Sequence, residues 1–375
     1  MVKAPQRALW VISVSTLAGV ARHVLDVAET GIEGWDLSFL LPEGPLADEL
    51  RARGAPIEAE EFGKRHGTLA SLRALRKVIS RNPPEIVHSH LAWADIVSAM
   101  AVSSGWRLLS TEHGVAPGNL YHRRHLKRAL RRAVHRARVR RMDAIIAVSR
   151  ATAAVAESAW GRPRSGSFAV IPNGVDHPPR TRRVTSPGTR FGCLARLARE
   201  KDFDTLLAAF ERVRERMPSA TLDIAGTGEL EPCLRDEIDR NGLAPAVRLR
   251  GFMEPEQFFG EVDVVVQLSL WENCSYSVLD AVVRGKGLVA TEVGGYLEYL
   301  PGRCLAPVGD AASAADRMIE QATEVALRPQ LPADWPSVRE MTERIARVYA
   351  DVSATRAPGE RAPAAPPPVV SSRAG

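Results

Sequence analysis

The chain has 375 residues, of which 45% are hydrophobic and 25% are charged, and its formal net charge is +6. This length predicts two domains of about 100–200 residues each. Such a chain buries enough apolar surface to fold without disulfides or a metal ion. No stretch approaches the roughly 20 apolar residues that a membrane span needs. None of the four cysteines belongs to a C-x-x-C pair, which argues against a zinc site or a secreted disulfide framework and favours a cytoplasmic protein.

The N-terminus can be interpreted in two ways. Lys3 and Arg7 precede an apolar run over 8–21, as in a short signal peptide. Polar residues at Ser13 and Ser15 interrupt the run, however, and an amphipathic pattern follows it. We therefore favour a first β-strand over 8–14.

Short apolar runs alternate with helical patterns along the whole chain, which is typical of βα units and a parallel sheet. Residues 178–188 contain three prolines and almost no apolar side chain, as expected of a linker. In the first half the pattern predicts strands over 8–14, 35–40, 85–88, 107–110, 144–148 and 168–171, with helices over 20–29, 69–80, 94–103 and 151–159. In the second half it predicts strands over 190–194, 220–225, 247–250, 262–266 and 287–290, with helices over 203–217, 230–241, 277–284, 311–326 and 338–352.

The resulting organisation is two doubly wound α/β domains. Such domains bind ligands in a cleft at the carboxyl ends of their strands. We expect an N-terminal domain at 1–178, a linker at 179–189, a second domain at 190–330, a C-terminal helical segment at 331–353 that could return to the first domain, and a disordered tail at 354–375 rich in Ala and Pro.

Two basic residues follow the first strand of the second half. Arg196 and Lys201 lie five positions apart, just before a helix. Two cations at this position suit a diphosphate, which offers many charged acceptor oxygens, and a helix N-terminus favours the same ligand. A solvated loop explains the pattern equally well when it is taken alone.

A glycine-containing turn follows the next strand. Gly226 and Gly228 permit a tight turn, but Glu231 occupies the place of the third glycine of a dinucleotide-binding fingerprint. A plain strand-to-helix turn is therefore favoured over a phosphate cradle.

The most informative segment is 269–300. Glu272 follows a buried strand, the polar run 273–277 opens a helix, and Asp280 lies eight positions after Glu272. A carboxylate at a strand end accepts hydrogen bonds from sugar hydroxyls, while amides at a helix start donate to a polyol or phosphate. The spacing also permits a purely helix-capping role for both carboxylates.

Together these segments resemble one family. The ordered motifs R-x4-K, G-x-G-E-L, W-E-N-x-x-Y-S-V-L-D-A and A-T-x-V-G-G-x-x-E are similar to the donor domain of GT-B glycosyltransferases of family 4. The likeness extends to VIPNGVD (170–176), DAIIAVS (143–149) and HSHLAWAD (88–95). It implies two Rossmann-like domains facing across a cleft, and a retaining, metal-independent transfer of a sugar from a nucleoside diphosphate sugar, with UDP favoured over GDP.

The resemblance also implies residue roles. Arg196 and Lys201 would hold the donor diphosphate, Glu272 would bind the donor sugar, and His113 would face the reacting sugar. The remaining donor-binding residues would be Gly19 near the phosphates, Phe252 near the base, Asp280 at the ribose, and the run Asn273, Cys274, Ser275, Tyr276 and Ser277 beside the sugar. Asp280 is one methylene shorter than the family's usual glutamate, and Ala18 replaces a second glycine, so these two positions depart from the pattern.

We expect no metal ion at this site. The D-x-D formed by Asp202 and Asp204 opens a helix, where acidic residues favour the macrodipole, and is interpreted as capping. His88 and His90 flank a strand end without evident partner ligands in the sequence. Two cations perform the charge neutralisation that a metal would otherwise supply.

A strongly basic segment spans 122–141, without an acid until Asp143. Leu126, Leu130, Ala133 and Ala137 fall on one helical stripe, and Arg124, Lys127, Arg128, Arg131, Arg132 and Arg138 cover much of the opposite side. The pattern suggests an anionic membrane surface, a solvated helix packed on the sheet being the plain alternative. No aromatic interleaving or known module favours nucleic acid.

The acceptor is left open by the sequence: a glycan, a lipid-linked saccharide or a small molecule, in polysaccharide or cell-envelope synthesis. The rival functions on the same fold are an epimerase, a phosphorylase, and a non-catalytic subunit that binds a sugar nucleotide.

Overall fold

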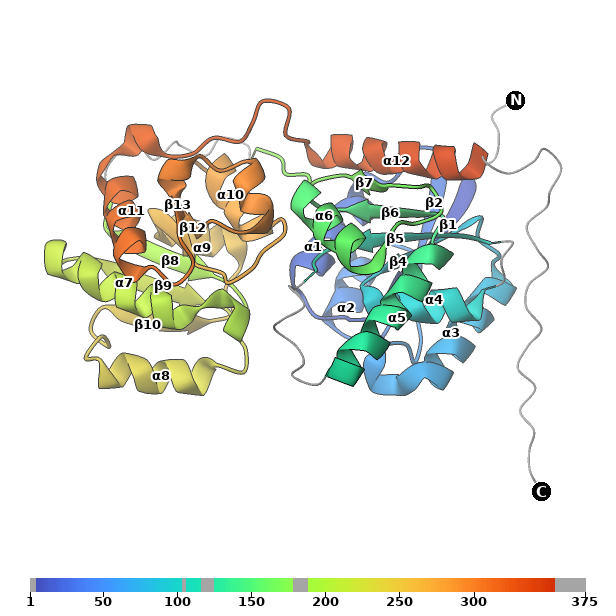
Figure 1. The fold of residues 1–375 in the computed structure, drawn as a ribbon, viewed down its shortest axis with the longest axis horizontal. Coiled ribbons are helices and arrows are strands. Elements are labelled where there is room, and N and C mark those ends of the chain that lie inside the picture. Colours follow the sequence, from blue (N-terminus) through green and yellow to red (C-terminus); the bar gives the residue numbers. More distant parts are fainter. Residues whose placement is uncertain (1–4, 103–105, 116–124, 178–187, 355–375) are drawn as a thin grey trace, which may run out of the picture. The chain divides into compact units, whose positions relative to one another are not determined.

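The structure is a computed structural model that describes residues 5–102, 106–115, 125–177 and 188–354, with side chains omitted at 125–128. The chain forms two compact units. The first unit comprises residues up to Gly174 and from Pro336 onward, and the second comprises Val175–Trp335. Each unit contains one parallel sheet with helices on both faces (Figure 1).

The sheet of the first unit has seven strands in the order β3-β2-β1-β4-β5-β6-β7. Every pairing in it is parallel. The chain order reverses between β1 and β4, which is where doubly wound sheets open a crevice for a ligand. The strands are β1 (Gln6–Ile12), β2 (Trp35–Leu41), β3 (Ile57–Ala59), β4 (Ile86–His90), β5 (Arg107–Glu112), β6 (Ala144–Ala147) and β7 (Phe168–Val170).

Both faces of this sheet are buried, as is usual for parallel sheets. Along β1, Trp10 belongs to the core on one face and Leu9 and Val11 to the core on the other. One face is covered by α1 (Gly19–Thr30), α2 (Pro45–Ala52) and α12 (Val338–Ala354), and the other by α3 (Gly67–Arg81), α4 (Ala92–Ala101) and α5 (His125–Arg141), with α6 (Arg150–Trp160) beside α5.

The sheet of the second unit has six strands in the order β10-β9-β8-β11-β12-β13 and repeats this topology. Its main core lies between the sheet and α7, α8 and α11, and α9 and α10 contact its strands as well. The strands are β8 (Arg190–Leu194), β9 (Thr221–Ala225), β10 (Val247–Gly251), β11 (Val264–Gln267), β12 (Gly287–Thr291) and β13 (Leu305–Ala306), and the helices are α7 (Phe203–Arg216), α8 (Glu231–Arg240), α9 (Pro255–Glu261), α10 (Tyr276–Val283) and α11 (Ala311–Thr323).

The predicted α/β class is confirmed, and each predicted strand and helix is present within a few residues of its expected bounds. Residues 6–12 form a central strand, as favoured above. The short elements β3, β13, α2 and α9, of two to eight residues each, were not predicted from the sequence. Most of the predicted linker and nearly all of the predicted tail lie outside the described residues.

All four cysteines are free thiols. Among the described helices, none is both long and apolar enough to cross a membrane.

The C-terminal helix α12 is fixed to the first sheet by a buried hydroxyl. Tyr349 on α12 accepts a hydrogen bond from Trp10 Nε1 at 2.9 Å, and its hydroxyl lies 2.7 Å from Nδ1 of His88 on β4. All three side chains are fully buried. The distant C-terminal helix therefore completes the core of the N-terminal unit.

We expect Tyr349→Phe to lower the stability of the first unit by about 1–3 kcal/mol, because the buried Trp10 N–H loses its acceptor. Thermal unfolding, with hydrogen exchange followed in α12, measures this loss. Tyr299→Phe is the matched control, since the Tyr299 hydroxyl is buried without a hydrogen-bond partner among the described residues. Equal losses in the two variants would contradict the role given to the Tyr349 hydroxyl.

Candidate functional site

Arg196 and Lys201 both lie on the loop that follows β8. Lys201 Nζ lies 2.5 Å from Oε2 of Glu272, and each of these two side chains is 15% exposed. Arg196 is largely exposed and forms an ion pair with Glu200, four residues along the same loop. Both residues predicted to bind the diphosphate are thus paired with carboxylates.

Glu272 is placed by the chain segment that follows β11. Besides its contact with Lys201, its Oε1 accepts a hydrogen bond from the Asn273 amide at 3.1 Å. Gly294 lies against it with a positive φ of 48°, and a Cβ added there would approach the Glu272 carbonyl oxygen to 1.8 Å. Only glycine fits that position, so Gly294 allows the chain after β12 to pack directly against the Glu272 backbone.

The polar run after Glu272 leads into α10. Ser275 is the N-cap residue in an extended conformation, and its hydroxyl lies 3.0 Å from that of Ser277 rather than capping the helix. Amides in the first turn of a helix lack partners within the helix. Of the run Asn273–Ser277, the Asn273 amide contacts the Glu272 carboxylate, and the donor-binding role of the other members stays a prediction.

Asp280 lies one turn further into α10, and its side chain is buried. Its Oδ1 accepts from Arg284 Nη1 at 3.0 Å, and Arg284 also forms an ion pair with Glu256 on α9. The ribose-binding role implied by the resemblance stays a prediction. In this structure the Asp280 carboxylate pairs with Arg284, which was not part of the prediction.

Gly226 and Gly228 pack against the loop that carries Arg196. A Cβ at Gly226 would lie 1.9 Å from the Ala195 carbonyl oxygen, and one at Gly228 would lie 2.2 Å from that of Leu197. Leu197 N donates to the Thr227 carbonyl at 3.0 Å. These glycines thus position the loop, in agreement with the turn favoured above. Phe252, predicted near the base, follows β10 and is 59% exposed.

The predicted site residues of the first unit also follow strand ends. Gly19 begins α1 after β1 and is exposed, with open space where a Cβ would stand. His113 follows β5, is half-buried, and its Nε2 lies 2.9 Å from Nδ1 of His90 at the end of β4. No partner of His90 was evident from the sequence, because residues 23 positions apart meet only when neighbouring parallel strands end together.

His113 belongs to a larger group of imidazoles. The ring of His23 on α1 contacts those of both His90 and His113, with centroids 5.7 and 4.9 Å away. Burial lowers the pKa of His23 to about 4, against a smaller opposing effect of Asn173, and burial also lowers the pKa of His90 and of His113 well below the usual value. The three rings are therefore neutral at pH 7.

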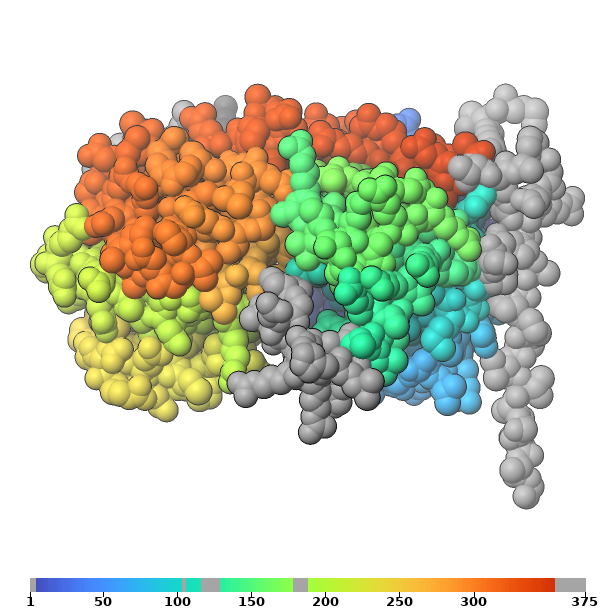
Figure 2. Space-filling model, in the orientation of Figure 1, coloured from blue at the N-terminus to red at the C-terminus, as the bar shows by residue number. Residues whose placement is uncertain are grey.

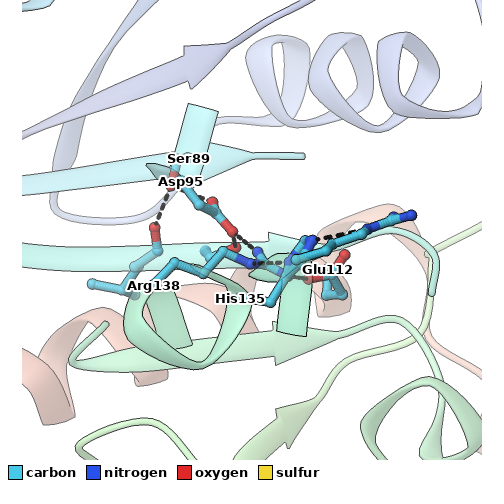
Figure 3. Close-up of polar contacts among 8 residues, drawn as sticks. Ser89, Asp95, Glu112, His135 and Arg138 are labelled. Carbon is cyan, nitrogen blue, oxygen red and sulfur yellow. Dashed lines mark hydrogen bonds and ion pairs between the residues drawn. The ribbon is translucent and has the colours of Figure 1, made fainter. Parts of the chain in front are cut away.

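A buried ionic network lies beneath this edge of the sheet (Figure 3). Arg138 on α5 forms ion pairs with Asp95 on α4 and, at 2.6 Å, with Glu112 at the end of β5. Asp95 also accepts from Ser89 and Ser110 at 2.6 and 2.9 Å. Because Glu112 immediately precedes His113, the network fixes the backbone from which His113 projects.

The charged groups of the network shift one another's pKa values. Burial raises the pKa of both Asp95 and Glu112, and Arg138 opposes that shift. Burial alone lowers the pKa of Arg138, but the two carboxylates raise it above its ordinary value. The arginine therefore stays charged in the core.

The prediction for α5 was wrong for Arg138, which it placed with the other basic residues on the side opposite the apolar stripe. His135, Arg138 and Val139 face the interior, whereas Leu130, Ala133 and Ala137 are exposed. Two buried carboxylates attract an arginine inward at the expense of an alanine, which gains little from burial. The helix lies at the surface of the first unit in Figure 2; Arg124 lies outside the described residues, as do the side chains of Leu126, Lys127 and Arg128.

Comparison with known proteins identifies the class that this fold and these strand-end residues define. Residues 17–177 match the family described as Glycosyltransferase Family 4, and residues 188–324 match Glycosyl transferases group 1. The chain belongs to the glycosyltransferases of family 4, and it has their GT-B fold. This confirms the predicted enzyme class.

Individual relatives agree with this assignment. A glycogen synthase of Mycobacterium tuberculosis is 29% identical over 311 residues, covering 76% of this chain and 72% of the relative. A lipopolysaccharide core biosynthesis mannosyltransferase of Rhizobium meliloti is 28% identical over 181 residues, 44% of this chain and 49% of the relative.

Solved structures share the fold. The Anabaena protein Alr3699/HepE in complex with UDP-glucose has a TM-score of 0.77 at 19% identity, covering 92% of this chain and 99% of that one. Sucrose-phosphate synthase of Thermosynechococcus elongatus has a TM-score of 0.76 at 15% identity, covering 94% of this chain and all of that one.

We expect Arg138→Met to destabilise the first unit by about 3–5 kcal/mol, because it leaves two buried carboxylates without a cation. Arg136→Met, on the exposed side of the same helix, should change stability by no more than about 0.5 kcal/mol. Urea unfolding of both variants measures the difference. Similar stabilities would show that the buried ion pairs do not hold α5 to the sheet.

Proposed function

We propose that this glycosyltransferase transfers a sugar from a nucleoside diphosphate sugar, UDP rather than GDP, with retention of anomeric configuration and without a metal ion. The acceptor we propose is a glycan, a lipid-linked saccharide or a small molecule in polysaccharide or cell-envelope synthesis, reached from the cytoplasm.

The observation that carries this proposal is the meeting of Lys201 and Glu272 at the carboxyl ends of β8 and β11, with Arg196 on the same loop. These two strands flank the point where the sheet order reverses, and ligands bind at such points in doubly wound sheets. A cation pair there suits a diphosphate, and the adjoining carboxylate suits the hydroxyls of the sugar joined to it.

The charges fit a reaction in which a diphosphate departs. The leaving group gains negative charge as the bond to the sugar breaks, and Arg196 and Lys201 stabilise that charge in the manner of an oxyanion hole. Glu272 holds the sugar through its hydroxyls, and His113, neutral at pH 7, is available to hydrogen-bond to the reacting sugar. In this scheme no step requires a metal ion.

The choice of donor is supported by the relatives. The Anabaena structure is described as a complex with UDP-glucose, and the group includes a glycogen synthase and a mannosyltransferase. Thermal shifts with UDP-glucose and GDP-mannose test the base directly, because a ligand at about 100 times its Kd stabilises a protein by about 2.7 kcal/mol.

We expect Arg196→Ala and Lys201→Ala each to lower turnover by about 10²–10³, the usual cost of removing one donor to a developing anion. Transfer from the donor that gives the largest thermal shift is the measurement. Arg199→Ala is the matched control, because Arg199 is exposed on the same loop and has no role in the proposed site. Near-normal transfer by both site variants would overturn the assignment.

For the acceptor side, we propose that the outer face of α5 contacts an anionic membrane. That face presents exposed Leu130 and Val134 and a hollow of about 380 Å³ lined by Ala129, Arg132, Ala133, Arg136, Ala137 and Arg140. Apolar side chains flanked by arginines suit an anionic lipid surface, where each cation contributes about 1 kcal/mol.

Vesicles containing anionic lipid should retain the protein at low salt, and neutral vesicles should not. Arg132→Glu/Arg136→Glu should weaken retention by more than about tenfold, because two attractive charges become repulsive. Arg235→Glu/Arg240→Glu makes the same change in net charge on the exposed side of α8 and should bind like the wild type. Equal loss in both double variants would indicate a general charge effect and would remove α5 as the docking surface.

A further inference from the structure

Three histidines from separate elements converge in the first unit. His23 comes from α1, His90 from the end of β4, and His113 from the loop after β5. Each offers one ring nitrogen, and these three nitrogens all lie within 4.8 Å of one another. His23 and His90 are buried, while His113 is half-buried and gives the group its access to solvent.

The three side chains are of a type that binds metal ions. Imidazole binds metals through the lone pair of a ring nitrogen. Independently, the two ring nitrogens of His23 are buried, and neither has a hydrogen-bond partner among the described residues. Buried nitrogens normally have a partner, so this lack points to a ligand for one of them.

We propose that His23, His90 and His113 bind one first-row divalent metal ion, of which Zn²⁺ is the best fit, and that the bound ion inhibits transfer. Three imidazoles with a fourth position open to water form a common zinc site, with Zn–N distances of about 2.0–2.1 Å. Imidazole ligands select zinc, copper, nickel or iron over magnesium and calcium.

The geometry requires only local adjustment. Nδ1 of His90 and Nε2 of His113 are 2.9 Å apart and share a hydrogen bond. Tetrahedral zinc would hold two such nitrogens about 3.3 Å apart, so the metal replaces that hydrogen bond with a small outward movement. The His23 ring, which already contacts the rings of His90 and His113, supplies the third ligand.

Inhibition follows from the identity of one ligand and rests on the proposed function. His113 is the histidine proposed to face the reacting sugar. Zinc bound at its Nε2 would fix the ring within the cluster and place a positive charge beside it, so the ring could no longer adjust to the sugar. The binding of the ion itself does not depend on the enzymatic role.

Binding is tested on metal-free, tag-free full-length protein titrated with Zn²⁺ by calorimetry and with Co²⁺ by visible absorption. We expect one equivalent of each, an intense Co²⁺ spectrum typical of low coordination number, and no heat with Mg²⁺. His23→Gln and His90→Gln should each weaken binding by at least about 10–100-fold. His177→Gln, at an exposed histidine outside the cluster, should bind like the wild type. Circular dichroism verifies that each variant is folded.

Absence of zinc binding by the wild type, or undiminished binding by both cluster variants, would overturn the site. The transfer assay then tests the consequence: stoichiometric Zn²⁺ should abolish activity, a chelator should restore it, and His23→Gln should be active and resistant to Zn²⁺. Activity unaffected by bound zinc would overturn the inhibitory role. A protein that binds zinc but transfers no sugar from any donor would instead contradict the proposed function and leave the metal site standing.

Discussion

Parallel pairing of every strand in both sheets is the constraint on which the rest of this structure depends. In a parallel sheet all carboxyl ends meet at one edge, so side chains that follow different strands become neighbours regardless of their separation in sequence. Lys201 and Glu272 are brought together in this way in the second unit, and His90 and His113 in the first. The two units therefore form their polar sites by the same device.

Burial on both faces of the sheets has a second consequence. A polar group near the end of a buried strand has no access to water and must find a partner within the protein. Asp95 and Glu112 meet this requirement through Arg138, which turns α5 so that an arginine faces the core. The same rotation exposes Leu130 and Ala133. The apolar surface of α5 is thus a result of the ionic network beneath it.

This coupling explains which features the sequence could predict. Strands and long helices are encoded by local periodicity, and they were predicted to within a few residues, as β8 and α7 illustrate. The position of Glu272 between a strand and a helix was predicted because one continuous strand-turn-helix segment contains it, and its role in binding a donor stays a prediction. The orientation of α5 was not predicted correctly. Helical periodicity assigns a polar residue such as Arg138 to the exposed side, and it contains no information on the buried carboxylates of α4 and β5.

Other omissions have the same origin. The convergence of His23, His90 and His113 depends on which strands are neighbours, and the pairing of Arg284 with Glu256 depends on the packing of α9 beside α10. Gly226 and Gly294 could be recognised as turn residues, but the carbonyl oxygens that exclude a side chain there belong to distant loops. In each case the missing information is a contact between segments that the chain order does not relate.

The ion pair of Lys201 with Glu272 has a mechanistic implication within the proposed function. Lys201 and Glu272 neutralise each other, and Arg196 is neutralised by Glu200. A donor that carries both a diphosphate and a sugar offers Lys201 an anion and Glu272 a set of hydroxyl donors, so one ligand replaces both partners of the ion pair. Free phosphate would compete only for the lysine and leave a partly buried carboxylate without its cation, which is unfavourable. The pair therefore favours a complete nucleotide sugar over its fragments, because only the complete donor satisfies the two charges at once.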